Sequence, residues 1–207
     1  MNNTIDWLMN LIQSEYIPAQ DIPDIVLYMD QVTTFMESKL DSSRRYPDDK
    51  IMTKTMINNY TKNHLIPPSV KKKYSRDHMF FIIIIYYLKT ILSISDIKQL
   101  LTPLVERYFP ENKENGISLE QIYSHNMMVN EERLDTIRED ILHLYELSRR
   151  NQLLEDTDQV SDKEQEFLDD FAFICSLSYD IYIRKKIVEK LIDLHKEKVP
   201  SRHKKKK

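Results

Sequence analysis

Glycine and cysteine are nearly absent from this chain of 207 residues, which contains one of each, Gly116 and Cys175. Glycine enters left-handed turns at low cost, so a single glycine argues against a hairpin-rich β fold and against a glycine loop that holds phosphates. One cysteine excludes an intramolecular disulfide framework and fits a reducing compartment. We therefore expect a mostly helical protein of the cytoplasm.

Long apolar stretches are missing as well. The longest run, from Met79 to Leu88, has ten residues and ends at Lys89, whereas a helix needs roughly 20 residues to span a bilayer. At the N-terminus, Asp6 and Asn10 interrupt the apolar residues, so we expect no signal peptide. The sequence predicts no membrane segment.

The residues that could perform catalysis or bind metals are not spaced as such sites require. The six histidines are scattered over positions 64, 78, 125, 143, 195 and 203, without the ligand spacing of a metal site. The acidic pairs at 131–132 and 169–170 have no basic or nucleophilic companion at useful spacing, so a solvated surface is the simpler interpretation. We predict no enzyme activity, no metal and no cofactor.

Hydrophobic residues make up 41% of the chain, which is compatible with a folded core. Their spacing by threes and fours predicts an all-α, mainly helical fold. Serine or threonine stands at the expected start of five helices, namely Thr53, Ser75, Ser93, Ser118 and Ser161, because these side chains accept from free backbone N–H groups there.

The expected helices differ in how much of their surface is apolar. Helices over 4–14 and 30–40 are apolar on one side, and the helix from 75 to about 92 contains the apolar stretch Phe80–Leu88. A helix that is apolar on every side is buried. We expect Pro103 to kink or end the helix that begins at 93. Further helices are expected between 118 and 150 and over 161–198.

Charge is segregated along the chain. Residues 44–76 hold nine Lys and Arg against two Asp, and residues 196–207 hold seven basic residues against one Glu. Because the formal net charge is only −3, the other 162 residues total −16. Basic surfaces of this kind attract the phosphates of nucleic acids. Residues 44–76 are therefore the predicted functional surface of the protein.

The order of elements in this region is helix, helix with exposed amides and lysines, basic segment, buried helix. That order is typical of a winged helix-turn-helix, whose second helix enters the major groove of double-stranded DNA. We predict a recognition helix at about 53–63 and a basic wing at 67–76. The predicted DNA-binding residues are Lys54, Thr55, Asn58, Asn59, Lys62, Lys71, Lys72, Lys73, Tyr74 and Arg76. Amides read base edges and lysines hold phosphates.

The stretch 53–101 resembles the DNA-binding domain of the MerR family of transcriptional regulators. Residues 58–60 and 65–68, which read Asn-Asn-Tyr and Leu-Ile-Pro-Pro, fall where that family has Arg-Tyr-Tyr and Gly-Leu-Leu-x-Pro. Tyr and Ser at 74–75 stand where its wing closes onto the third helix, and Ser-Ile-Ser-Asp-Ile at 93–97 matches its Ser-Leu-x-Glu-Ile helix start. This resemblance implies a winged helix-turn-helix fold and DNA binding.

The departures from MerR concern the DNA-contacting positions. The family's recognition-helix arginine is Asn58 here, its Gly-Tyr-Arg wing is Val-Lys-Lys at 70–72, and the loop after the first of the two helices is longer. Base specificity is therefore not carried over.

A closer resemblance, over residues 22–105, is to a bacterial family catalogued as domain of unknown function 1836. It is carried by Leu-Tyr-Met-Asp-Gln-Val at 27–32, by Thr-Lys-Thr-Met-Ile-Asn-Asn-Tyr at 53–60 and by Lys-Lys-Tyr-Ser at 72–75. This family has no assigned activity, so the resemblance supports the fold and not a function.

These patterns lead to a four-part organisation. We predict an N-terminal helix and connector over 1–21, a MerR-like winged helix-turn-helix domain over 22–110, a helical region for dimerisation or partner binding over 111–200, and a disordered basic tail over 201–207. The first hypothesis is a DNA-binding transcription regulator that forms a homodimer through its C-terminal helices. The alternative is a helical protein-interaction module without DNA binding, which the acidic remainder of the chain favours. Small-molecule sensing by the C-terminal half is compatible with either.

Overall fold

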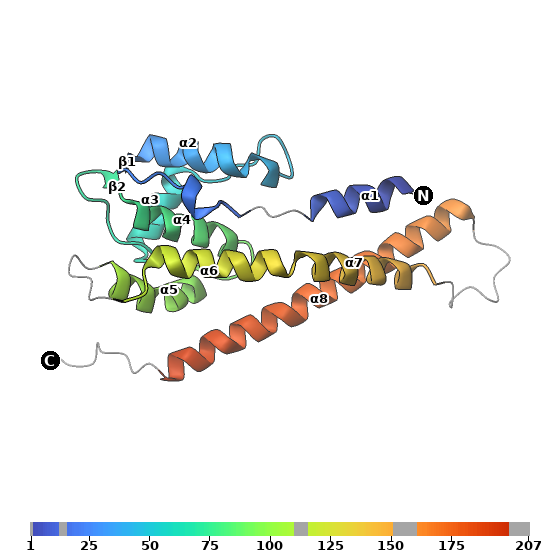
Figure 1. Cartoon of the computed structure of the whole chain (residues 1–207). Coiled ribbons are helices and arrows are strands. Elements are labelled where there is room, and N and C mark those ends of the chain that lie inside the picture. The colour runs from blue at the N-terminus through green and yellow to red at the C-terminus, as the bar shows by residue number, and fades with distance from the viewer. Residues whose placement is uncertain (1, 13–15, 110–115, 151–160, 199–207) are drawn as a thin grey trace. The chain divides into compact units, whose positions relative to one another are not determined.

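The computed structural model describes residues 2–12, 16–109, 116–150 and 161–198, and these are mostly helical (Figure 1). The predicted mainly helical fold is therefore confirmed. The elements are α1 (Asn2–Leu11), η1 (Ala19–Asp21), β1 (Leu27–Tyr28), α2 (Met29–Leu40), η2 (Asp41–Ser43), α3 (Lys54–Lys62), β2 (Lys73–Tyr74), α4 (Arg76–Leu88), α5 (Ile94–Tyr108), α6 (Leu119–Glu132), α7 (Leu134–Ser148) and α8 (Asp162–Lys198).

The chain divides into two compact units. The first contains Met1–Ser14 and Asn130–Val188, and the second contains Glu15–Val129 and Glu189–Lys207. The predicted basic tail at 201–207 lies outside the described residues. The four-part division of the chain stays a prediction.

The helix starts follow from side chains that accept backbone hydrogen bonds. Thr53 Oγ1 accepts from the amide of Met56 at 3.1 Å, and Ser93 Oγ accepts from the amide of Asp96 at 3.2 Å. The other three predicted caps form the same kind of bond at Ser75, Ser118 and Ser161. All five predicted helix starts are thus confirmed, because a cap depends only on residues within one helical turn.

One helix ends earlier than predicted, and another does not end at its proline. Helix α4 ends at Leu88 and not near residue 92, and the Lys89 ammonium that follows it donates to the carbonyl oxygen of Ile51 at 2.8 Å. Helix α5 passes through Pro103 and continues to Tyr108. Pro103 is exposed, so the backbone hydrogen bond that proline cannot donate is lost on the solvent side of the helix, where its loss costs less.

The core of the second unit is built around α4. The Phe80–Ile83 stretch is fully buried, which confirms that this apolar run is core. Side chains from the connector, α2, α3, α5 and α6 pack with it into one cluster, which includes Ile22, Val32, Met36, Ile57, Leu101 and Tyr123. The helix must be apolar on nearly every side because it is surrounded on nearly every side.

Helix α6 completes this core from a distant part of the chain. Its residues Leu119, Tyr123 and Met127 are buried in the same cluster. The Tyr123 hydroxyl donates to the carbonyl oxygen of Ile17 at 2.6 Å, so the start of the connector and the first half of α6 are held together. The end of α8 joins the same unit, where the amide of Gln99 in α5 donates to the carbonyl oxygen of Ile192 at 2.8 Å.

A short antiparallel sheet lies against α2 and α4 of this unit. Strand β1 pairs with β2 in the register Leu27 with Tyr74 and Tyr28 with Lys73. Because β1 leads directly into α2 and β2 directly into α4, the sheet joins the N-terminal ends of these two helices (Figure 1).

The first unit combines α1, α7 and most of α8. The Tyr145 ring of α7 meets the Phe173 ring of α8 edge to face at 5.4 Å, and Arg149 forms an ion pair with Asp170 at 2.7 Å. The Arg138 guanidinium reaches the carbonyl oxygen of Ile12 after α1 at 2.7 Å. In the described part of the chain, no helix is both long and apolar enough to cross a membrane.

Candidate nucleic-acid interface

Helix α3 presents one polar face and one buried face. Ile57 is fully buried and Tyr60 is 5% exposed, whereas Thr55, Asn58, Asn59 and Lys62 are exposed. The exposed residues follow one another at steps of three and four, which places them on adjoining sides of the helix. The expected division of this helix into an inward and an outward face is found in the structure.

The start of α3 is fixed against the start of α2. The Lys54 ammonium forms an ion pair with the Asp30 carboxylate, and both side chains are well exposed. An exposed pair of this kind contributes little stability, but it neutralises one of the lysines predicted to bind DNA. Lys54 must leave Asp30 before it binds a phosphate.

The predicted basic wing contains a tight turn. Val70 and Lys73 form both hydrogen bonds of a two-residue hairpin, with N···O distances of 3.1 and 2.9 Å. The two residues between them, Lys71 and Lys72, have φ angles of 50° and 62°. This is the backbone of a hairpin turn that normally takes Asn-Gly, because both central residues have positive φ.

This turn is strained by its sequence. Side chains with a Cβ resist positive φ, at a cost of roughly 1–2 kcal/mol per residue. Both lysines are nevertheless exposed to solvent, so burial of their side chains does not compensate for the strain. Strained residues of this kind concentrate at functional sites, and here the strain places two adjacent ammonium groups at the tip of the hairpin.

The base of the wing is held by the sheet. Tyr74 is 4% exposed and pairs with Leu27, so its side chain belongs to the core. The Lys73 ammonium lies 5.4 Å from the centre of the exposed Tyr28 ring, a cation–π arrangement. Tyr28 and Asp30 are two residues apart, so Lys73 and Lys54 both contact the β1–α2 junction. The wing and the start of α3 are thereby brought close together.

His78 connects the wing to α4. Its Nδ1 accepts from the backbone N–H of Ser75 at 3.0 Å, and its ring lies edge to face against Tyr74 and Phe109. The side chain is 2% exposed. Burial lowers the pKa of His78, and the carbonyls of Pro68 and Pro67 and the charge of Asp77 oppose this effect only in part.

Arg76 is turned into the unit and not toward the wing. Its guanidinium donates twice to the Glu120 carboxylate, with both N···O distances at 2.9 Å, and once to the carbonyl oxygen of Ala19 at 2.8 Å. It also lies over the Phe80 ring. Arg76 is one of the predicted phosphate contacts because it lies in the basic segment 67–76. Its pairing with Glu120 was not predictable, since Glu120 is 44 residues away and no local pattern indicates it.

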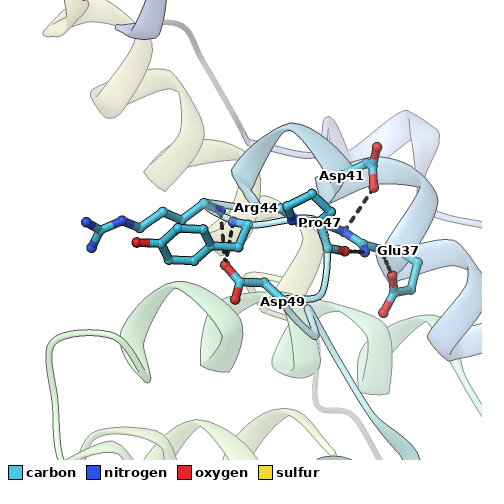
Figure 2. A network of polar contacts seen from close by, with 7 residues as sticks. Glu37, Asp41, Arg44, Pro47 and Asp49 are labelled. Carbon is cyan, nitrogen blue, oxygen red and sulfur yellow. Dashed lines mark hydrogen bonds and ion pairs between the residues drawn. The ribbon is translucent and has the colours of Figure 1, made fainter.

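The loop between α2 and α3 is ordered by polar contacts (Figure 2). The Arg44 guanidinium forms ion pairs with Glu37 and with Asp41, and it donates to the carbonyl oxygen of Pro47 at 3.2 Å. The Asp49 carboxylate accepts from the amides of Arg45 and Tyr46 at 3.1 and 2.9 Å.

This loop displays a pair of side chains that sequence reasoning missed. The Arg45 guanidinium lies 5.2 Å from the centre of the Tyr46 ring, and Tyr46 is 56% exposed. The excess of Lys and Arg in residues 44–76 indicates a basic surface here. Sequence spacing does not distinguish Arg45, which faces solvent, from Arg44, which is held by carboxylates.

The predicted site residues thus fall into three groups. Thr55, Asn58, Asn59 and Lys62 are exposed on α3, and Lys71 and Lys72 are exposed on the wing. Lys54 and Lys73 are tied to the β1–α2 junction. Tyr74 and Arg76 hold the core together. Among the described residues, no three His, Cys, Asp or Glu side chains gather as metal ligands do.

The family described as Domain of unknown function (DUF1836) matches residues 17–126. These limits agree with the core, which begins at Ile17 and includes Tyr123 of α6. The structure is a helical domain in which the β1–β2 ribbon lies beside α2 and in which α3 has one polar face. The chain belongs to the DUF1836 family. No curated protein and no solved structure matches it.

Proposed function

We propose that this protein is a cytoplasmic DNA-binding transcription regulator with a MerR-like winged helix-turn-helix domain. The order β1, α2, α3, hairpin turn, β2, α4 supports this proposal, since it provides a helix with an exposed polar face and a wing beside it. The observation that carries the proposal is the turn of Lys71 and Lys72, which presents two positive charges at a backbone geometry unfavourable to lysine.

In this proposal α3 enters the major groove and the wing contacts the phosphates. Asn58 and Asn59 offer amides that pair well with adenine, and a good bidentate contact discriminates by about 1–3 kcal/mol. Lys62, Lys71 and Lys72 supply affinity that does not depend on sequence. Tyr74 and Arg76 act as positioning residues, because their contacts fix the wing and α4.

Titration of the full chain against a pool of random duplexes tests the proposal. We expect Asn58→Ala to remove sequence preference with a modest loss of affinity, since the helix and its lysines remain. Lys72→Ala should weaken all sequences alike and lower the slope of log affinity against log salt by about 0.9. Lys98→Ala, which removes an exposed lysine of α5, is the matched control and should change neither.

No retained complex in dilute buffer contradicts the proposal as a whole. Equal effects of Asn58→Ala and Lys72→Ala on every sequence contradict base reading by α3 and leave only phosphate binding.

A second candidate function is a helical protein-interaction module that has lost DNA binding. The ion pairs Lys54–Asp30 and Arg76–Glu120 favour it, because they neutralise two of the predicted cations. The acidic remainder of the chain favours it as well. Two results together would support this candidate in place of the first. The chain forms no DNA complex, and it binds an immobilised acidic protein in a way that the double variant Lys71→Gln with Lys72→Gln abolishes.

A further inference from the structure

Helix α8 exposes a stripe of large apolar side chains within the first unit. Phe167, Phe171, Ile174 and Ile181 are each between 56% and 66% exposed. They are separated by four, three and seven residues, which is the spacing of the core positions in a coiled coil. Contiguous exposed apolar surface of this kind is uncommon on a monomer and marks an interface.

The charges along α8 indicate which partner fits this stripe. Residues 162–170 contain five carboxylates and one lysine, whereas 184–186 are Arg-Lys-Lys. Two copies of the helix in antiparallel orientation place the acidic start of each opposite the basic segment of the other. A parallel pair places like charges together, which is unfavourable.

We propose that a second copy of this chain packs antiparallel on the Phe167–Ile181 stripe of α8. The interface is two-fold symmetric and uses the same surface of both copies. The acidic segment is centred on Glu166 and the basic segment on Lys185, so the two-fold axis passes close to Cys175, halfway between them. Cys175 is exposed and follows Ile174 at the edge of the stripe. This dimer does not depend on DNA binding and is tested without DNA.

The single cysteine makes this arrangement measurable, because any cross-link between cysteines joins two copies. We expect a short bismaleimide to join Cys175 of one copy to Cys175 of the other. In the variant Cys175→Ser with Leu168→Cys, the thiol moves two helical turns along the same edge. At a rise of 1.5 Å per residue, the two thiols of an antiparallel pair are then about 20 Å apart along the helix axis, and no cross-link forms.

Efficient cross-linking at both positions indicates a parallel pair and overturns the proposed orientation. Cross-linking at residue 168 alone indicates a register with a different axis and overturns the proposed centre. Cross-linking at neither position, with a monomer in sedimentation, shows that no second copy binds the stripe and overturns the proposal.

Sedimentation tests the stripe itself. We expect the wild-type chain to form a dimer at high micromolar concentration. Phe171→Asp should raise the dimer dissociation constant by more than about tenfold, since it places a charge where the dimer buries an aromatic ring. Ile117→Asp is the matched control, because Ile117 is 63% exposed and precedes α6 in the second unit. Equal effects of the two substitutions, or none from Phe171→Asp, overturn the proposal.

Discussion

The turn of Lys71 and Lys72 allows one prediction that joins stability to function. Replacement by Asn-Gly supplies the residues that a two-residue turn with positive φ at both positions prefers. The native φ angles of 50° and 62° each cost lysine roughly 1–2 kcal/mol. Glycine removes this cost and asparagine removes part of it. We therefore expect Lys71→Asn with Lys72→Gly to raise the free energy of unfolding by about 1–2 kcal/mol.

The same double substitution should weaken the proposed DNA binding, because it removes the two phosphate contacts that we propose for the wing. Each contact contributes about 0.9 to the slope of log affinity against log salt, so the slope should fall by about 1.8 in all. A protein that becomes more stable and binds less well would show that the strain is retained for the charges at the tip of the turn.

Two assays measure the two effects. Urea denaturation of the full chain, followed by circular dichroism, gives the change in unfolding free energy, and duplex titration at several salt concentrations gives the slope. Lys71→Gln with Lys72→Gln is the matched control, since it removes both charges and keeps a Cβ at both positions. It should lose DNA affinity without a gain in stability. If Asn-Gly does not stabilise the fold, the turn is not strained by its lysines. If the glutamine variant keeps its salt slope, these lysines do not contact phosphates.

Two further predictions concern the contacts that support the wing. The pKa of His78 in the folded protein is below 6.5, so the unfolded chain binds the proton at a higher pH than the folded chain does. The free energy of unfolding should therefore fall as pH drops below about 6.5. The variant His78→Gln, whose side chain can still accept from the Ser75 N–H, should flatten this dependence in denaturation experiments between about pH 5 and 7.5. Glu120→Ala leaves the half-buried Arg76 without its carboxylate and should lower the unfolding free energy by about 1–2 kcal/mol, whereas Asp21→Ala, at an exposed ion pair with Lys39, should cost less than about 1 kcal/mol. A flat stability profile for the wild type, or equal losses for the two carboxylates, would contradict these expectations.

Much of the fold was predictable because the relevant forces are local. Thr53 and Ser93 start helices through bonds to residues three positions away, and the period of apolar residues determines which side of α3 is buried. The length of α4 was overestimated because its apolar pattern continues beyond Leu88, where the chain leaves the helix and Lys89 bonds to Ile51.

The candidate site was predicted less completely than the helices. Residue type and spacing placed Asn58, Asn59 and Lys62 on an exposed face, because a helix repeats every 3.6 residues. The left-handed turn at Lys71 was not predictable, since lysine is not the residue such a turn prefers. The ordering of the α2–α3 loop by Arg44 was likewise hidden, because a basic residue has the same local signature whether it faces solvent or a carboxylate.

The helical class, the helix starts and the inward and outward faces follow from the order of residues alone, since each depends on residues within one or two turns of one another. Three features emerge only when the chain is folded: Arg76 binds Glu120 across 44 positions, Tyr74 is buried, and Lys54 and Lys73 both contact the β1–α2 junction. The physical reason is that a long charged side chain takes its partner from whatever the folded chain brings within reach, and sequence spacing does not encode that neighbour.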